Sequence, residues 1–350
     1  MGDCGPDNSA SKFSDWSAAM AGLVTIFGGS GFLGRYVARR MAAQGWRVRV
    51  AVRRPNESMH VKTYGSVGQV EPVFANIRDD ASVQAAVAGA DAVVNCVGTF
   101  DASGRNNYTA VHVDGAERIA RLSAEAEVKS FIHVSAIGAD ESSESEYSST
   151  KAKGEHAVLS HISGAVILRP SVIFGAEDKF FNRFAGMARL MPVLAIAGAS
   201  TKFQPVYVGD VAEAVERAIL QGEPGTYELG GPEVKTLSGW METMQRSIRR
   251  NRLLVNIPFF VANIVALGLD IAQAVTLGLF KNSVLTRDQV RMLRNDNVVS
   301  NRAKSLEDLG VVPTSAEIIL DEYLWPYRPS GQFFEIKESA KNLKSSNSGG

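Results

Sequence analysis

Residues 23–34 read LVTIFGGSGFLG, a short apolar and β-branched run followed by a glycine-rich turn. The glycines at positions 28, 31 and 34 have the spacing G-x-x-G-x-x-G, and a helical pattern follows them. Gly28 permits a tight turn, Gly31 lets the backbone approach a phosphate closely, and Gly34 lets the helix pack against the strand. An ordinary strand-to-helix turn is the alternative, but the strand before the turn and the helix after it favour a dinucleotide-binding loop. We predict that the pyrophosphate lies at the helix N-terminus and contacts Gly28, Ser30, Gly31, Phe32, Leu33 and Gly34.

From residue 22 to residue 169 the chain alternates between apolar runs of strand length and amphipathic stretches of helix length. Strands are predicted at 23–27, 47–52, 70–74, 92–97, 131–135 and 166–168. Helices are predicted at 32–44, 79–88, 108–127 and 147–160. Apolar strands separated by helices are typical of a parallel sheet that is covered on both faces. Since crossover connections are right-handed, we expect an α/β fold with a Rossmann-type doubly wound parallel sheet.

The regular alternation weakens after Pro170, where isolated strands are predicted at 226–229 and 253–257. We therefore predict four parts of the chain. They are a flexible N-terminal tail at 1–20, a Rossmann domain at 21–170, a smaller mixed C-terminal lobe at 171–330 and a flexible tail at 331–350. The smaller lobe is expected to close over the C-terminal edge of the sheet.

Composition excludes several classes of function. Lys+Arg and Asp+Glu both count 37, so the chain lacks a large basic field and no nucleic-acid partner is expected. The two cysteines, Cys4 and Cys96, have no metal-binding spacing and suit a reducing compartment, so no metal site is predicted. Three aspartates and a single lysine precede residue 20, which is typical of neither a secretory signal nor a mitochondrial transit peptide. We expect a chain that is kept in a cytoplasm, or one that has already lost its targeting segment.

The end of the second strand indicates which dinucleotide is bound. Sites specific for NAD place an acid there for the ribose 2′-hydroxyl, whereas this chain reads Arg53-Arg54. Two guanidiniums can clamp a 2′-phosphate, and Arg35 can add a third contact, so the predicted cofactor is NADP(H). Solvated loop charges are the alternative interpretation of Arg53 and Arg54. Further predicted contacts follow the third, fourth and sixth strands, at Asn76, Ile77, Cys96, Val97, Gly98 and Pro170.

A tyrosine and a lysine with the spacing Y-x-x-x-K follow the fifth predicted strand, at Tyr147 and Lys151. Positions i and i+4 share one face of a helix, so both side chains can point at one site. A nearby ammonium favours the phenolate and also reaches the cofactor ribose, while Ser135 is placed to hold a substrate oxygen. An exposed Tyr and Lys are the default for this spacing alone. Following the fifth strand of a G-x-x-G-x-x-G fold, the spacing predicts catalytic and cofactor-binding roles for Ser135, Tyr147 and Lys151.

Together these motifs resemble the short-chain dehydrogenase/reductase superfamily in its extended and atypical branches, over residues 22–230. A closer resemblance is to the NADPH-binding accessory subunits of respiratory complex I, over about 22–330. It is based on RPSVIFGAEDKFFNRF (169–184), FQPVYVGDVA (203–212), TYELGGP (226–232) and LTRDQV (285–290). The resemblance implies a tightly held structural nucleotide and a place on the peripheral arm near the quinone region. Without a transit peptide, it implies the cytoplasmic face of the bacterial inner membrane, which is equivalent to the matrix side in mitochondria.

One residue departs from the pattern of the catalytic relatives. They carry Asn-Val-x-Gly-Thr on the fourth helix, whereas this chain reads His112-Val113-Asp114-Gly115-Ala116. Since the asparagine organises the proton path in those enzymes, His112 argues against turnover, and Ser135, Tyr147 and Lys151 are then latent. The favoured hypothesis is a non-catalytic accessory subunit of complex I. The alternative is a freestanding NADP-dependent reductase or epimerase.

The segment 257–280 is strongly apolar and contains Asp270 as its single charged residue. Three interpretations remain open. The segment is a helix packed within the C-terminal lobe, a helix that contacts the membrane surface or a partner subunit, or a membrane span. Asp270, near the middle, makes a span costly. The accessory-subunit hypothesis gives the second interpretation a natural role.

Overall fold

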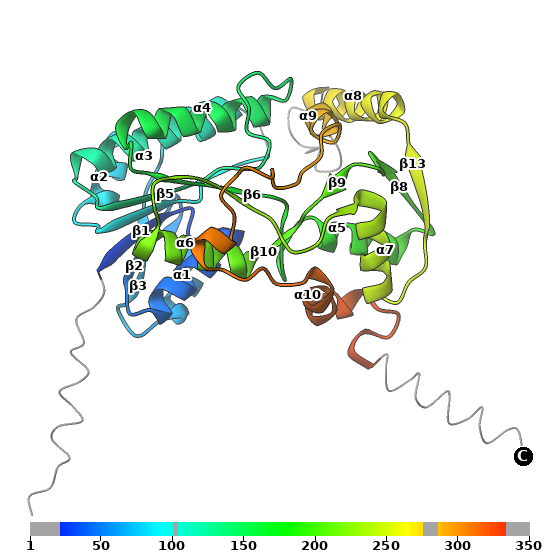
Figure 1. Ribbon diagram of the computed structural model, residues 1–350, viewed down its shortest axis with the longest axis horizontal. Coiled ribbons are helices and arrows are strands. Elements are labelled where there is room, and N and C mark those ends of the chain that lie inside the picture. The colour runs from blue at the N-terminus through cyan, green and yellow to red at the C-terminus, as the bar shows by residue number, and fades with distance from the viewer. Residues whose placement is uncertain (1–21, 101–103, 276–285, 334–350) are drawn as a thin grey trace, which may run out of the picture.

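The computed structural model describes residues 22–100, 104–275 and 286–333 (Figure 1). The predicted tail at 1–20 lies outside these residues, as does the tail at 331–350 apart from a short 3₁₀ turn, η7 (Gly331–Phe333). Residues 276–280 of the apolar segment also lie outside them.

A seven-stranded parallel sheet forms the centre of the molecule. Its strands are β1 (Leu23–Phe27), β2 (Arg47–Val52), β3 (Val70–Phe74), β4 (Ala92–Asn95), β5 (Ser130–Val134), β6 (Val166–Pro170) and β11 (Gly225–Leu229). They lie in the order β11-β6-β5-β4-β1-β2-β3. The order reverses between β1 and β4, and in open sheets of this kind ligands bind outside the carboxyl ends of the strands at such a point. The predicted Rossmann-type doubly wound fold is confirmed.

Helices cover both faces of this sheet. Helices α2 (Asp80–Val87), α3 (Asp114–Glu125) and α4 (Glu146–His161) lie on one face, and α1 (Phe32–Ala43) and α6 (Val208–Gln221) lie on the other (Figure 1). Because strand side chains alternate between faces, Val93 of β4 is buried on the first side and Val94 on the second. The two helical layers thus bury the apolar side chains on both faces of the sheet.

The sheet takes its last strand from beyond residue 170. Strand β11 pairs in parallel with β6, from Gly225 opposite Val166 to Leu229 opposite Pro170. A parallel neighbour needs a crossover connection, and α6 supplies it. The proposed division into domains at residue 170 stays a prediction, and the sheet itself extends past that residue.

The remaining elements form a second packed region, on the right of Figure 1. Its core contains Phe181, Leu194, Trp240 and Leu320. Its main elements are α5 (Phe181–Leu190), β8 (Val193–Ala197), α7 (Leu237–Ser247), β13 (Leu253–Ile257) and α10 (Ala316–Tyr323). The strand predicted at 253–257 is confirmed as β13, which pairs in parallel with β8. Two short pairs join the regions, β7 (Ile173–Phe174) with β10 (Val206–Tyr207) and β9 (Lys202–Phe203) with β12 (Lys235–Thr236).

Short helical turns complete the described residues. A 3₁₀ helix, η3 (Pro55–Tyr64), follows β2, and a π-helix, η4 (Thr109–Val113), precedes α3 within the single helix predicted at 108–127. Two further 3₁₀ turns are η5 (Glu307–Leu309) and η6 (Trp325–Tyr327). π-Helical turns are frequent at functional sites, which draws attention to His112 within η4.

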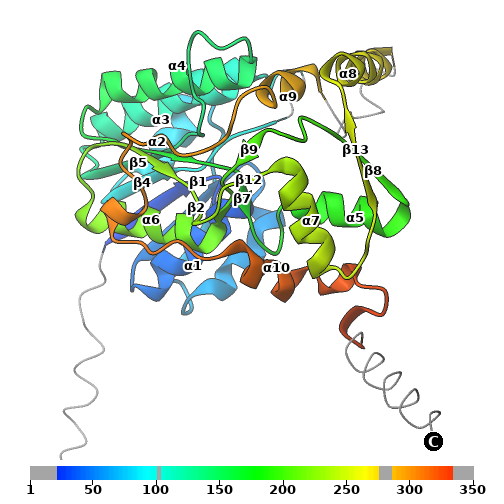
Figure 2. The same ribbon diagram turned by 45° about the vertical axis from the view of Figure 1, so that its right-hand side comes forward.

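The apolar segment forms a strand end and then a helix. Ile257 ends β13, and α8 (Phe259–Val275) begins after Pro258. One face of α8 packs through Ala262 and Ala266 against Val290 of α9 (Arg287–Met292). Its side chains Phe260, Ile264, Val265 and Leu267 are exposed. Helix α8 lies at the edge of the molecule in Figure 2. No helix among the described residues is both long and apolar enough to cross a bilayer.

A buried ion pair fixes α4 to the edge of the sheet. Arg169 of β6 donates to both carboxylate oxygens of Glu155, at 2.9 and 2.6 Å. The Glu155 side chain is 5% exposed, and Glu228 of β11 lies 3.8 Å from the same guanidinium. The RP motif that begins the 169–184 stretch therefore anchors the helix that carries Tyr147 and Lys151.

Replacing Glu155 with alanine leaves the Arg169 guanidinium without its main partner. We expect Glu155→Ala to lower the free energy of unfolding by about 3 kcal/mol, measured by urea denaturation. The matched control is Glu125→Ala, because Glu125 is 56% exposed in its ion pair with Arg121. That change should cost less than about 1 kcal/mol. Equal losses in the two variants would contradict the anchoring role.

Candidate functional site

The glycine loop has the geometry of a phosphate-binding turn. Gly28 has a φ of +75°, which favours glycine, and Gly31 N–H donates to Gly28 O at 2.9 Å. A Cβ on Gly34 would lie 2.3 Å from Gly28 O, so only glycine lets α1 approach β1 this closely. No side chain caps the N-terminus of α1, and its first turn contains no acid. The first N–H groups of α1 are therefore available to an anion.

The three arginines predicted to hold a 2′-phosphate lie at two places. Arg53 and Arg54 are exposed just after β2, where Arg54 pairs with Glu57 at 3.0 Å. Arg35 lies against the glycine loop, where its guanidinium donates to the carbonyls of Gly31 and Ser30. It also pairs with Glu177 at 3.3 Å. Arg35 is thus already anchored by protein groups, whereas Arg53 and Arg54 face solvent.

The residues predicted after β3 and β4 lie along the same edge of the sheet. Ile77 packs against Gly115 of α3, where a Cβ would lie 2.6 Å from Ile77 Cδ1, and the backbone of Asn76 bonds to Ser82. Burial raises the pKa of Cys96 to about 12, so the thiol stays protonated. Val97 N–H donates to Asn95 Oδ1 at 3.0 Å, which fixes the turn through 96–98.

Helix α4 brings Tyr147 and Lys151 to the adjoining strand end, as the Y-x-x-x-K spacing predicts. Lys151 is buried and donates through Nζ to Val134 O at 3.1 Å. A Cβ on Gly98 would lie 3.4 Å from the same Nζ, so the 96–98 turn passes directly over the lysine. Ser135 Oγ is buried and has no hydrogen-bond partner among the described residues. At the next strand, Pro170 is buried and its carbonyl accepts from Ile137 N–H.

Aromatic rings enclose the Tyr147 side chain, which is 7% exposed. The Phe100 ring stacks on it with centroids 4.6 Å apart, and the rings of Tyr108 and His112 meet it edge-on. Burial, and then Tyr108, raise the pKa of Tyr147 above its usual value. Burial lowers the pKa of Lys151 to about 8. The pKa of the phenol is therefore shifted away from neutrality, in contrast to the lowered pKa that acid–base catalysis by such a pair needs.

Both ring nitrogens of His112 are in hydrogen bonds. Thr99 N–H donates to Nε2 at 3.2 Å, so Nε2 is an acceptor and the proton is on Nδ1, which lies 3.1 Å from Thr150 Oγ1. Burial, and then the charge of Lys151, lower the pKa of His112 to about 3. Helix α4 packs closely against η4, because a Cβ on Gly154 would lie 2.1 Å from His112 O. His112 is therefore a neutral bridge between η4, α4 and the turn after β4.

A second buried histidine lies beside this cluster. Asn95 Nδ2 is 3.1 Å from His133 Nδ1, and because Asn95 Oδ1 accepts from Val97, the amide nitrogen is the donor. The proton of His133 is then on Nε2, which has no partner among the described residues. Burial lowers the pKa of His133 to about 3. The sequence indicated neither Asn95 nor His133, because inside an apolar strand they are not distinguishable from ordinary core positions.

Other site residues also escape prediction from sequence. Glu177 accepts from the Tyr36 hydroxyl at 2.8 Å and pairs with Arg35, although it is far from both in sequence. Asp288 of α9 accepts from the backbone N–H groups of Glu146 and Tyr147 at the start of α4. Both acids lie in stretches on which the family resemblance was based. No local pattern indicates which helix they reach, because that depends on the packing of the two regions.

The other motif residues are structural. Asp178 accepts from backbone N–H groups of Gly175, Phe180 and Asn182 and from the Tyr323 hydroxyl. Asp210 of the 203–212 stretch accepts from the N–H and hydroxyl of Thr314, each at 2.7 Å. The Asp178 contacts organise the second region itself, and the Asp210 contact joins α6 to the segment before α10.

The comparison with solved structures supports the fold. The chain matches the crystal structure of gox2253 with a TM-score of 0.68 at 22% identity, covering 89% of this chain and 99% of that one. It matches the NADPH-dependent quinone oxidoreductase QOR2 from Escherichia coli, complexed with NADPH, with a TM-score of 0.65 at 17% identity. That match covers 86% of this chain and 98% of the other.

Sequence relatives identify the family more closely. The NAD dependent epimerase/dehydratase family matches residues 24–230. The chain is 34% identical over 345 residues to the mitochondrial NADH dehydrogenase [ubiquinone] 1 alpha subcomplex subunit 9 of Arabidopsis thaliana, covering 96% of this chain and 86% of that protein. It is 32% identical over 311 residues to the mitochondrial NADH-ubiquinone oxidoreductase 40 kDa subunit of Neurospora crassa, covering 88% and 80%. The resemblance seen in the motifs is confirmed. The chain belongs to the family of these complex I subunits, within the NAD dependent epimerase/dehydratase family.

Proposed function

We propose that the chain is a non-catalytic accessory subunit of respiratory complex I that holds a nicotinamide dinucleotide as a fixed part of its fold. Relatives named as subunits of that complex match most of the chain, which supports the assembly role. The observation that carries the non-catalytic assignment is His112. Its Nε2 accepts from the backbone N–H of Thr99, which does not release its proton, so the ring has no free nitrogen with which to take a proton from the cofactor site. A bound nucleotide then stabilises the folded state by mass action.

The surroundings of Tyr147 also support a latent site. The Phe100 ring lies flat on the phenol, and the Lys151 ammonium is bonded to a backbone carbonyl. The predicted freestanding reductase or epimerase would need an open, polar pocket at this point and a tyrosine with a lowered pKa. That alternative therefore fits the chain less well than the accessory role. Ser135, Tyr147 and Lys151 are assigned to holding the nicotinamide ribose.

We assign the nucleotide as NADP(H). Arginines and not an acid directly follow β2, and Arg53 and Arg54 are exposed at the strand end where the ribose 2′-phosphate is expected. Guanidiniums bind phosphate through two parallel hydrogen bonds, and the ribose of NAD has no 2′-phosphate to accept them. The adenine end lies along Asn76 and Ile77, the pyrophosphate at 28–34, and the nicotinamide end at 96–98, Ser135 and Pro170.

The double variant Arg53→Ala/Arg54→Ala tests this assignment. Loss of two phosphate contacts should weaken NADPH binding by roughly ten- to a hundredfold and leave NADH binding nearly unchanged, as measured by isothermal titration calorimetry. Arg302→Ala is the matched control, since Arg302 is also exposed but lies away from the glycine loop. If the double variant lost NADH and NADPH binding equally, or neither, the NADP(H) assignment would be refuted.

Tyr147→Phe separates a latent site from an active one. The variant loses one neutral hydrogen bond to the ribose but keeps Lys151, so it should bind NADPH within about tenfold of the wild type and still enter complex I. The measurements are nucleotide titration and native electrophoresis of solubilised membranes. A reductase activity that is present in the wild type and lost in Tyr147→Phe would favour the enzyme instead. Failure of the wild-type chain to migrate with complex I would exclude the accessory role.

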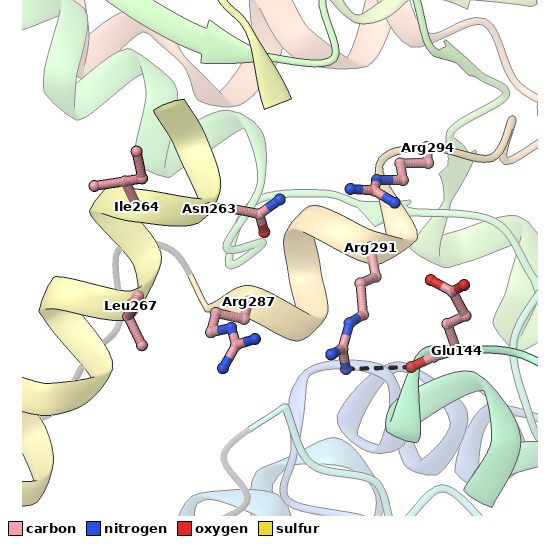
Figure 3. Close-up of a pocket in the computed structure, with 7 residues that line it drawn as sticks. All are labelled: Glu144, Asn263, Ile264, Leu267, Arg287, Arg291 and Arg294. Atoms are coloured by element: carbon pink, nitrogen blue, oxygen red, sulfur yellow. Dashed lines mark hydrogen bonds between the residues drawn. The ribbon is translucent and has the colours of Figure 1, made fainter. Parts of the chain in front are cut away.

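We place the subunit on the peripheral arm near the quinone region, at the cytoplasmic face of a bacterial inner membrane or the equivalent matrix side in mitochondria. Contact with the membrane surface is assigned to α8 and the pocket beside it. That pocket is lined by Glu144, Asn263, Ile264, Leu267, Arg287, Arg291 and Arg294 (Figure 3). Apolar side chains beside three arginines suit a surface that carries anionic headgroups over acyl chains.

Vesicle binding tests the membrane contact. Ile264→Asn should reduce co-sedimentation of the purified chain with vesicles of phosphatidylcholine and phosphatidylglycerol by several-fold, because it removes apolar area that would enter the interface. Ile318→Asn on α10 is the matched control, since Ile318 is 63% exposed and Ile264 is 66% exposed. Equal binding of both variants and the wild type would rule out α8 as the membrane contact.

A further inference from the structure

The N-terminus of α4 is bonded by a carboxylate that comes from the other end of the chain. Asp288 Oδ1 accepts from Glu146 N–H at 2.8 Å, and Oδ2 accepts from Tyr147 N–H at 3.2 Å. The same Oδ2 accepts from the Ser145 hydroxyl at 2.9 Å. Ser145 in turn accepts from Ser148 N–H at 3.3 Å, as the N-cap of α4. Asp288 therefore binds the backbone of Tyr147 directly.

These bonds satisfy groups that a helix cannot satisfy by itself. The first N–H groups of a helix have no partner within it, and a negative charge at that end is favoured by the helix dipole. Asp288 supplies the acceptors for the first two N–H groups of α4, and Ser145 supplies the acceptor for the third. Without Asp288, the first turn of α4 would retain only the Ser145 cap.

Asp288 is itself held in place by its own helix and by a neighbouring one. Thr286 and Gln289 form a capping box at the start of α9, and the buried Val290 packs against Ala262 and Ala266 of α8. Arg291, one turn further along, donates to Glu144 O at 3.3 Å, so a second contact joins α9 to the segment before α4 (Figure 3). The α8–α9 pair thus forms a fixed support for the turn that contains Tyr147.

We propose that Asp288 is a positioning residue of the nucleotide site, acting on the nicotinamide half through Tyr147 and Lys151. This inference rests on the proposed function, in which those two side chains hold the nicotinamide ribose. If the first turn of α4 is open for part of the time, the apparent affinity for NADPH equals the intrinsic affinity multiplied by the fraction of molecules in which the turn is closed. The adenosine half of the nucleotide, at the glycine loop and Arg53/Arg54, is out of reach of α4 and does not depend on Asp288.

Two ligands separate this role from a general loss of stability. NADPH spans the whole site, whereas 2′,5′-ADP occupies only the adenosine half. Asp288→Ala should weaken NADPH binding by roughly three- to thirtyfold, the range expected from loss of a helix cap, and change 2′,5′-ADP binding by less than about twofold. Asp288→Asn keeps one oxygen acceptor and should recover part of the NADPH affinity. Both ligands are titrated calorimetrically against the full chain, with the melting temperature of each variant recorded.

Asp308→Ala is the matched control. Asp308 also accepts from the N–H and the hydroxyl of a serine, Ser305, but it makes no bond to α4 among the described contacts. It should leave the binding of both ligands unchanged. Equal losses for NADPH and 2′,5′-ADP in Asp288→Ala, or no loss for either, would overturn the positioning role while leaving the nucleotide assignment intact.

If Asp288→Ala does not fold, Ser145→Ala removes one Asp288 contact and should show the same selective loss in weaker form. A wild-type chain that binds neither ligand would refute the proposed function and this inference with it.

Discussion

The close approach of helix α1 to strand β1 is the constraint on which the rest of the structure depends. It exists because residue 34 is glycine, whose missing side chain leaves room for Gly28 O. The approach directs the uncapped N–H groups of α1 at the crevice where the strand order reverses. The other predicted contacts of the nucleotide, from Arg53 to Tyr147, follow strands or begin helices at the same carboxyl edge of the sheet.

The same fold can serve catalysis or nucleotide binding alone, depending on the groups that surround the candidate site. Tyr147 and Lys151 lie on one helix beside the end of β5, and other protein groups occupy their surroundings. Lys151 bonds to Val134 O, Phe100 covers Tyr147, and the ring of His112 is used on both sides. Each of these contacts is made within the protein, although the Lys151 ammonium keeps two further N–H donors for a ribose. Retention of the three residues is thus compatible with binding alone.

Much of the fold could be predicted from sequence, because its strands, turns and helices are each indicated by patterns among neighbouring residues. The strand at 23–27, the glycine spacing and the 3.6-residue pattern of α4 each depend on neighbours within a few positions. The long-range partners could not be predicted. Nothing near Glu177 indicates that it pairs with Arg35, and nothing near Asp288 indicates that it meets α4. The predicted helix at 257–280 began too early, because the apolar residues up to Ile257 fit a strand equally well and Pro258 separates the two elements.

The return of the chain to the sheet at β11 has a consequence for synthesis of the protein. Until Gly225–Leu229 has been made, β6 is an edge strand whose apolar residues and unpaired backbone groups are open to another chain. The ion pair of Arg169 with Glu155 leaves that edge uncovered, since it lies on the side chains and not along the backbone. The N-terminal half must therefore wait for α6 and β11 before β6 becomes an interior strand of the sheet.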